Sequence, residues 1–454
     1  MLSAFRSAVR AAQTHKDLYF AGLLNKEDII SVGGHAMPGF RRWIYTPLIT
    51  ITVFLSQCLS SDHSCSKAVS KLLAWRTKNK LPPCSADTGA YCTARNELPE
   101  EACHALARNV GKASDDEAPE QWRWKGRRVY VVDGSTVTMP DTPKNQAEYP
   151  QESQQKKGLG FPIARILVVF SLAVGSAVEM SIGKYKGKLT GECSMFRRLL
   201  ALFEIGDVVI MDRAYSGWFD IMLCKQRGLD VIVRKNASRR ADFRRGKQLG
   251  PEDHITTIMK PSRPPEWMDR QQYEALPDEL EIRQTRIHVH QKGFRTKLII
   301  VETTLLDDEQ YTSEDLGHAF RLRWNAELNL RSLKSVLQMS HLRCKTPHRV
   351  RNEFYMHMLA YNLIRRIIAV ASLAASVHPW QISFKGALQT LTEFLAVLTT
   401  TTDTETWCDN MLNAIASHRI ANRPDRYEPR AIKRKINRYP KLNTPRAELK
   451  MAFR

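Results

Sequence analysis

Two short runs of consecutive apolar residues each lead directly into an aspartate. Residues 129–132 precede Asp133, and residues 208–211 precede Asp212. Runs of this kind predict strands buried on both faces, as in a parallel sheet. Ligands bind outside the carboxyl ends of strands in an open α/β sheet, so we expect both carboxylates at such an edge. Aspartate is also common in turns, but two runs of the same form make both residues candidates for holding one divalent cation.

The segments around these runs alternate between strand and helix patterns. Further strands are expected at residues 136–139, 163–174 and 178–185, and the apolar spacing becomes helical over residues 190–203 and 216–227. This mixture predicts an α/β fold with helices on both faces of a sheet.

A β-rich segment follows, with strands expected at residues 231–233, 281–290 and 296–304 and no clear helix between them. Near its start lies a run of seven cations against one acid. Such a run is typical of a loop that binds phosphates, although a solvated loop has the same composition. The candidate DNA contacts from this run are Lys235, Arg239 and Arg240.

A helical pattern over residues 313–337 supplies a third carboxylate. At 100° per residue, Arg323, Lys334, Glu327 and Phe320 fall within one 60° face of the helix. A separate apolar stripe on the same helix is expected to pack on the sheet: Ala319, Ala326, Leu330, Leu333 and Leu337. Arg323 and Glu327 could be an ordinary i,i+4 pair on a solvated helix, but Lys334 lies on the same face two turns later.

Three carboxylates with two flanking cations suit two-metal phosphoryl transfer. Carboxylate oxygens are the ligands that Mg²⁺ prefers, and two such ions can serve the attacking and leaving oxygens. Arg323 and Lys334 would then bind phosphates on either side of the scissile bond.

The charge balance points to the same class of partner. The chain has 68 Lys and Arg against 47 Asp and Glu, a formal charge of +21, which favours a nucleic acid. Its nine cysteines form no CxxC pair and are expected to be reduced thiols in a cytoplasmic protein. The apolar stretch at residues 44–59 is too short and polar for a membrane span.

Short helices are expected at the beginning of the chain. One starts at Pro47, a second is capped by Ser61 or Asp62, and a third covers residues 90–98 with Tyr91, Arg95 and Asn96 exposed. Three such helices on a basic protein are typical of a helix-turn-helix-like DNA reader, and equally of a helical cap on the next domain. An acidic run after them reads as a linker.

The spacing of Phe320, Arg323, Glu327 and Lys334 resembles the Tyr-Arg-Glu-Lys signature of the insertion sequence four family of bacterial DDE transposases. The strings VVDGSTVTMPDT and VVIMDRAYSG resemble the regions around that family's first and second catalytic aspartates, and TGAYCTARNELP resembles its amino-terminal domain. Phe320 replaces the signature tyrosine, so the hydrogen bond from its hydroxyl to phosphate is lost while stacking remains.

The resemblance implies an RNase H-like catalytic core that carries the β-rich insertion. The implied organisation is an N-terminal helical DNA-binding domain at 1–112, a linker at 113–121, the core at 122–230 and 307–375, the insertion at 231–306, and a helical, basic C-terminal region at 376–454. It also implies catalytic and metal-binding roles for Asp133, Asp212 and Glu327. The DNA contacts would include Phe320, Arg323, Arg331 and Lys334, with Trp267 of the insertion as a base-stacking residue or, more commonly for a tryptophan, a loop anchor.

The activity implied by the resemblance is cut-and-paste transposition. Two Mg²⁺ ions, with Mn²⁺ as a substitute, would support cleavage at terminal inverted repeats and strand transfer into target double-stranded DNA by a homodimer. We expect a bacterial, nucleoid-associated protein with no membrane partner. The alternatives are a nuclease or resolvase with an RNase H-like fold, and a catalytically retired transposase that still binds DNA.

Overall fold

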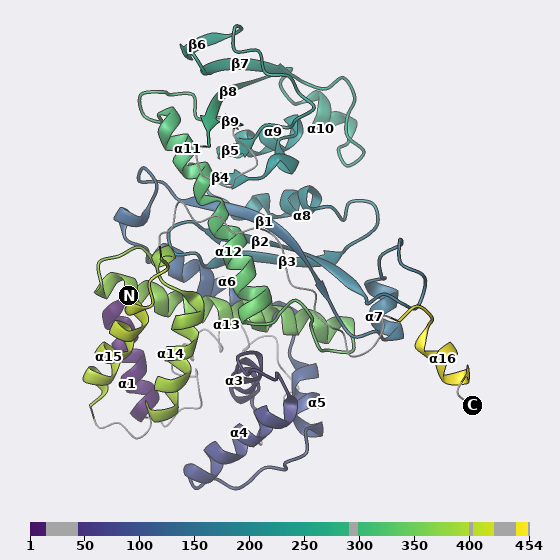
Figure 1. Ribbon diagram of the computed structural model, residues 1–454, viewed down its shortest axis with the longest axis vertical. Helices are drawn as coiled ribbons and strands as arrows, with labels where there is room; N and C mark the ends of the chain where they lie inside the picture. Colours follow the sequence, from purple (N-terminus) through teal and green to yellow (C-terminus); the bar gives the residue numbers. More distant parts are fainter. Residues whose placement is uncertain (15–43, 290–297, 399–402, 422–441, 453–454) are drawn as a thin grey trace. The chain divides into compact units, whose positions relative to one another are not determined.

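The computed structural model describes residues 1–14, 44–289, 298–398, 403–421 and 442–452 (Figure 1). By its internal contacts the chain divides into two compact units. Unit 1 comprises residues 1–137, 166–182 and 324–420, and unit 2 comprises residues 138–165, 183–323 and 421–454.

Unit 1 is built around one long helix. Helix α13 (Pro347–Ala374) has 28 residues, and nearly all of those from Val350 to Ser372 are buried. A helix buried to this extent is covered by other elements, and here α3, α6, α14 and α15 pack against it. The helices of unit 1 are α1 (Leu2–Thr14), α3 (Pro47–Cys58), α4 (Cys65–Lys78), α5 (Gly89–Glu97), α6 (Glu100–Asp116), η1 (Glu120–Trp122), α12 (Trp324–Arg331), η4 (Ser332–Val336), α13, η5 (Pro379–Gln381), α14 (Phe384–Val397) and α15 (Thr404–Ser417).

Three strands complete unit 1, apart from a few end residues: β1 (Val129–Thr138), β2 (Ile163–Ser171) and β3 (Ala177–Lys184), in the order β3-β2-β1. Helix α6 approaches β3 closely at Gly111, where an added Cβ would lie 1.9 Å from the carbonyl oxygen of Ala177. The buried amide of Asn362 on α13 accepts from the Ala177 N–H at 2.8 Å and donates to the carbonyls of Ala177 and Ala107, both at 2.8 Å. These contacts join α6, α13 and β3 into one core.

The N-terminal helices form where expected, but their exposure differs from the prediction. Helix α4 is capped by Ser64, which accepts from the Lys67 N–H at 3.1 Å, and not by Ser61 or Asp62. Tyr91 and Arg95, which we expected on an exposed face, are buried with 0% and 7% of their surface accessible. Both donate to the side-chain oxygen of Gln57 on α3, at 2.8 and 2.7 Å. The third helix is therefore a packed part of unit 1.

The predicted linker at residues 113–121 is wrong over its first half. Residues 113–116 form the last turn of α6, and Ser114 and Asp115 are buried. Asp115 accepts hydrogen bonds from the hydroxyls of Tyr130 on β1 and Ser171 on β2, at 3.0 and 2.5 Å. An acidic side chain satisfied inside the core has the same sequence signature as one in a solvated linker.

Six strands of unit 2 pair in the order β4-β5-β9-β8-β7-β6 (Figure 1). Strands β4 and β5 are parallel, and the remaining pairs are antiparallel. The polar strands β6 and β7 were not expected. The elements of unit 2 are α7 (Pro143–Glu148), α8 (Glu192–Leu199), η2 (Leu200–Leu202), β4 (Val208–Met211), η3 (Arg213–Tyr215), α9 (Trp218–Gln226), β5 (Asp230–Arg234), β6 (Lys247–Gly250), β7 (Asp253–Met259), α10 (Arg270–Glu274), β8 (Glu279–His288), β9 (Leu298–Thr303), α11 (Ser313–Leu322) and α16 (Arg446–Ala452).

The C-terminal region contributes α14 and α15 to unit 1. Helix α15, which was not expected, holds α1 through two ion pairs of 2.5 Å, Arg6 with Asp409 and Arg10 with Glu405. Residues 422–441 of the predicted basic C-terminal region lie outside the described residues. Within the described part of the chain, no helix is long and apolar enough to cross a membrane.

Candidate active site

Asp133 lies on β1 in unit 1. The strand does not end at this residue, as the apolar run suggested, but continues to Thr138. What changes at Asp133 is burial: the four residues before it are buried, and Asp133 to Thr136 are half-buried. The carboxylate accepts a hydrogen bond from the N–H of Gly134 at 3.0 Å. Side chains alternate between the faces of a strand, so Asp133 and Ser135 lie on the same face of β1.

Asp212 lies in unit 2, directly after β4, as the sequence predicted. It precedes the short helix η3, and its carbonyl accepts from the Tyr215 N–H at 3.0 Å. Strand β4 is buried along its whole length and pairs in parallel with β5. The side chain of Asp212 is half-buried at the carboxyl end of a core strand.

Glu327 lies in the first turn of α12, in unit 1. The predicted apolar stripe is confirmed: Ala326, Leu330, Leu333 and Leu337 are buried, as is Ala319 in α11. Helix α12 is also fixed by Arg365 of α13, which donates to the side-chain oxygen of Asn329 at 2.5 Å and to the carbonyl of Gly175 at 3.2 Å. Burial of the stripe and this hydrogen bond together set the face that carries Glu327.

Lys334 contacts the strand that bears Asp133. Its ammonium group donates to the hydroxyl of Ser135 at 2.9 Å, so the helical run after Glu327 is joined to β1 within unit 1. Burial lowers the pKa of Lys334 below its ordinary value. Residues 332–336 form a π-helical turn, so the uniform 100° spacing assumed for Lys334 does not apply there. The angular position of Lys334 relative to Glu327 is therefore not that of an ideal helix.

Phe320 and Arg323 lie on the preceding helical segment, in unit 2. The predicted continuous helix is interrupted at Arg323, which caps α11 before α12 begins. Phe320 is buried, with 8% of its surface accessible, and the guanidinium of Arg323 lies 5.8 Å from the centre of its ring. Arg331 on α12 is exposed. Trp324, the first residue of α12, is 45% exposed.

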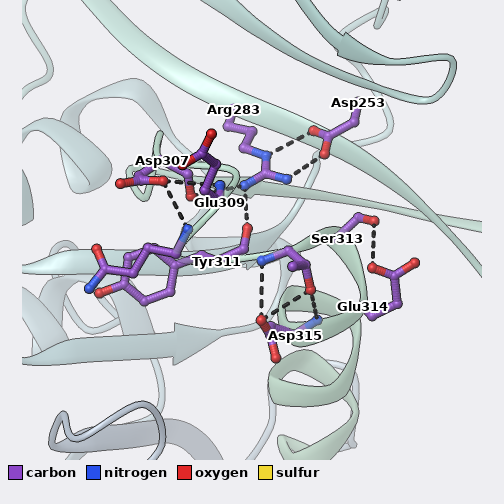
Figure 2. A network of polar contacts seen from close by, with 10 residues as sticks. Asp253, Arg283, Asp307, Glu309, Tyr311, Ser313, Glu314 and Asp315 are labelled. Atoms are coloured by element: carbon purple, nitrogen blue, oxygen red, sulfur yellow. Dashed lines mark hydrogen bonds and ion pairs between the residues drawn. The ribbon is translucent and has the colours of Figure 1, made fainter.

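The start of α11 is held by a buried arginine of the β-rich region (Figure 2). Arg283 of β8 forms a two-pronged ion pair with Asp253 of β7 and donates to the carbonyl of Tyr311 at 2.5 Å. Thr312 then caps the helix in a reciprocal pair of hydrogen bonds with Asp315. In unit 2 the insertion strands therefore fix the helix that leads to Arg323.

The basic run has internal partners that the sequence could not show. Arg239 forms an ion pair with the buried carboxylate of Glu302 on β9 and donates to the Ser216 carbonyl at 2.7 Å. Lys235 donates to the carbonyl of Asn236 at 2.9 Å, and Arg240 is exposed. Arg239 thus has a structural role in unit 2.

Trp267 lies on the loop before α10, and its ring is engaged within unit 2. The guanidinium of Arg197 lies 3.9 Å from the ring centre, and Phe219 packs edge-on at 6.1 Å. Arg197 also pairs with the buried carboxylate of Asp220 at 2.7 Å. These contacts anchor the loop to α8 and α9. They favour the role of loop anchor over that of a base-stacking residue.

The functional neighbourhood includes residues that the motif analysis missed. Ser135 was missed because it lies between the strands predicted at residues 129–132 and 136–139, whereas in the structure it is part of β1. Asn329 and Arg365 carried no local signal, since their hydrogen bond joins two helices far apart in the sequence. Among the residues that the structure describes, no group of three or more His, Cys, Asp or Glu side chains lies close enough together to hold a metal ion.

Comparisons with known proteins agree with the motifs. The family model for the transposase DDE domain matches residues 124–363, more than half of the chain, and includes Asp133, Asp212 and Glu327. The chain is 23% identical over 364 residues to transposase InsG for insertion sequence element IS4 of Escherichia coli (strain K12), covering 77% of each protein. It is 37% identical over 65 residues to the transposase for insertion sequence element IS421 of Escherichia coli, covering 14% of this chain and 18% of that protein.

A solved structure is also similar. The piggyBac transposase in a synaptic complex with hairpin DNA matches with a TM-score of 0.43 and 10% identity, over 89% of this chain and 87% of that one.

The chain belongs to the family of proteins with a transposase DDE domain. The predicted membership of the insertion sequence four group and the predicted function as a DNA transposase are confirmed.

Proposed function

We propose that this transposase moves its own insertion sequence by a cut-and-paste reaction. In this proposal it cleaves DNA at terminal inverted repeats and joins the freed ends to target DNA. The observation that supports the proposal is the hydrogen bond from Lys334 to Ser135, because it joins the strand of Asp133 to the helical run that follows Glu327. Lys334 is the cation that we propose binds phosphate.

The chemistry of the candidate acids fits a divalent metal. Asp133, Asp212 and Glu327 offer only carboxylate oxygens, the ligands that Mg²⁺ prefers over His or Cys. Asp133 and Glu327 belong to unit 1, and Asp212 belongs to unit 2. Two bound Mg²⁺ ions, with Mn²⁺ as a substitute, would supply an activated water or 3′-hydroxyl and stabilise the leaving oxygen.

The remaining candidate residues would bind and orient the DNA. Lys334, oriented by its hydrogen bond to Ser135, would bind one phosphate oxygen. Arg323 would bind a second one through its planar guanidinium. Arg331 and Arg240, both exposed, add charge for the DNA backbone. Phe320 supports Arg323 from a buried position. For Lys235, Arg239 and Trp267 the internal contacts favour a structural role, so DNA contact is proposed for them only as a secondary one.

The proposed partners are two terminal inverted repeats and a target duplex, bound by a homodimer on the bacterial nucleoid. Support comes from the formal charge of +21 and from the DDE transposase family itself. The N-terminal helices are proposed to contribute to DNA binding as part of unit 1.

Strand transfer separates this function from simple nuclease activity. Purified protein would be incubated with a duplex that carries the DNA end flanking its own gene, a supercoiled target plasmid and Mg²⁺. We expect covalent joining of the 3′ end to the plasmid, which EDTA abolishes. Cleavage without joining would indicate an RNase H-like nuclease, and binding without either reaction would indicate a retired transposase.

A further inference from the structure

Residues 337–346, here called the strap, connect the Lys334 turn to α13 in unit 1. Four of its side chains are buried: Leu337, Met339, Leu342 and Cys344. The side chains between them are exposed: Gln338, Ser340, His341, Arg343 and Lys345. The strap thus has one face in the core and one polar face turned to solvent.

The strap is held rigidly by a buried carboxylate. Glu353 of α13, only 4% exposed, accepts from the Arg343 N–H at 3.0 and 2.9 Å and from the Cys344 N–H at 2.8 Å. At its beginning, the N–H of Met339 bonds to the Leu333 carbonyl at 3.1 Å. The backbone is therefore fixed directly beyond the turn that carries Lys334.

Two side chains of the exposed face are also fixed, both to the turn between α3 and α4. Gln338 donates to the Ser61 carbonyl at 3.2 Å, and Arg343 donates to the Asp62 carbonyl at 2.7 Å. A guanidinium carries five N–H donors, so Arg343 keeps donors for a ligand while its position is set. Less side-chain entropy is then lost on binding.

The charge of this part of the chain has one sign. Residues 328–352 contain six Lys and Arg and no Asp or Glu. Four of these cations bond to other parts of unit 1: Lys334 to Ser135, Arg343 to Asp62, Arg349 to Asn96 and Arg351 to Glu100. Arg331, Arg343 and Lys345 are exposed to solvent.

We infer that the strap presents Arg343 and Lys345 to the phosphate backbone of duplex DNA. This inference rests on the proposed function, and it adds a second contact surface beyond the Arg323 and Lys334 positions. The strap begins at the turn that carries Lys334, so one DNA strand can be held at both places. Backbone contacts position DNA without reading its sequence.

Salt-dependent DNA binding tests the inference without requiring catalysis. The variant Arg343→Gln/Lys345→Gln would be compared with wild type on two 30-base-pair duplexes, one with the DNA end flanking the gene and one unrelated. Each lost phosphate contact lowers the slope of log K against log salt by about 1, so we expect a slope smaller by about 2 and affinity reduced roughly tenfold on both duplexes.

The matched control is Lys225→Gln/Arg227→Gln, which removes two exposed cations at the same spacing from the end of α9. It should change the affinity less than twofold. Arg343→Lys, with Lys345 unchanged, keeps both charges and should retain the wild-type slope. An unchanged slope in the strap variant, an equal loss in the control, or a loss confined to one duplex would each overturn the inference.

Folding and the proposed function are checked separately. Thermal unfolding of the strap variant must match wild type. If it does not, the single charge-reversal variant Lys345→Glu replaces it: a smaller salt slope supports the inference, and an unchanged slope overturns it. If wild type shows metal-dependent cleavage but the strap variants bind normally, only the strap inference fails. If the strap variant shows the expected decrease in slope relative to wild type, but wild type cleaves no DNA, only the proposed function fails.

Discussion

Ser135 gives Lys334 a defined position beside the strand of Asp133. A lysine in water samples many rotamers, whereas this ammonium is half-buried and bonded to a hydroxyl at 2.9 Å. The motif spacing predicted a phosphate-binding role for Lys334, but it could not predict the hydrogen bond to Ser135. The partner depends on the packing of α12 and η4 on β1, which is a tertiary property.

The protonation of Lys334 should set an upper pH limit for activity. Burial lowers its pKa from 10.5, so the ammonium loses its charge at a lower pH than a solvated lysine does. We expect the DNA cleavage rate to fall as pH rises toward that value. Lys334→Arg, which stays charged, should remove this alkaline decline even if its maximum rate is lower. An identical alkaline limb in both proteins would contradict the assignment.

At the scale of the elements, α6 and β3 depend on a glycine. An alanine at Gly111 would place its Cβ 1.9 Å from the Ala177 carbonyl oxygen, and backbone on both sides leaves little room to relax. We expect Gly111→Ala to lower the free energy of unfolding by about 3 kcal/mol or more. Gly183→Ala is the control, because its nearest atom, in Met195, is 3.8 Å away. Equal thermal stability of the two variants would refute this contact.

The fixed backbone of the strap should depend on the buried carboxylate of Glu353. Its carboxylate accepts three hydrogen bonds from backbone N–H groups, and glutamine would turn an amide donor toward those donors. Glu353→Gln is expected to lower the free energy of unfolding by roughly 2–3 kcal/mol. Glu314→Gln, at an exposed position of α11, should change it by less than about 0.5 kcal/mol. Urea unfolding measures both, and a stable Glu353→Gln variant would contradict the role of this carboxylate.

The periodicity of apolar residues predicted helices and strands better than it predicted the burial and hydrogen-bond partners of their side chains. The apolar stripe around Glu327 was correct because side chains on one helix face share one environment. Tyr91 and Arg95 were misplaced because a polar residue on a short helix is compatible with solvent or with a buried partner, and Gln57 lies on another helix. The π-turn at residues 332–336 and the end of α6 beyond residue 112 also depend on contacts that no local pattern encodes.

At the scale of the whole molecule, the motif order and the family domain agree over more than half of the chain. In the proposed reaction two DNA ends are cut and joined to the target, so the proposed assembly contains two protein chains and two ends. Sedimentation of the purified protein with a single-end duplex should give a complex of two chains and two duplexes. A complex of one chain and one duplex that still performs strand transfer would contradict the proposed homodimer.

The central claim is that Glu327 serves DNA cleavage at the ends of the element. The most direct measurement compares wild type, Glu327→Gln and Glu314→Gln on an end-labelled duplex carrying the gene's flanking sequence, with Mg²⁺ or EDTA. We predict metal-dependent cuts at one fixed position for wild type and Glu314→Gln. For Glu327→Gln we predict a loss of at least 100-fold in rate with DNA binding unchanged. Equal cleavage by Glu327→Gln, or cleavage in EDTA, would contradict the account.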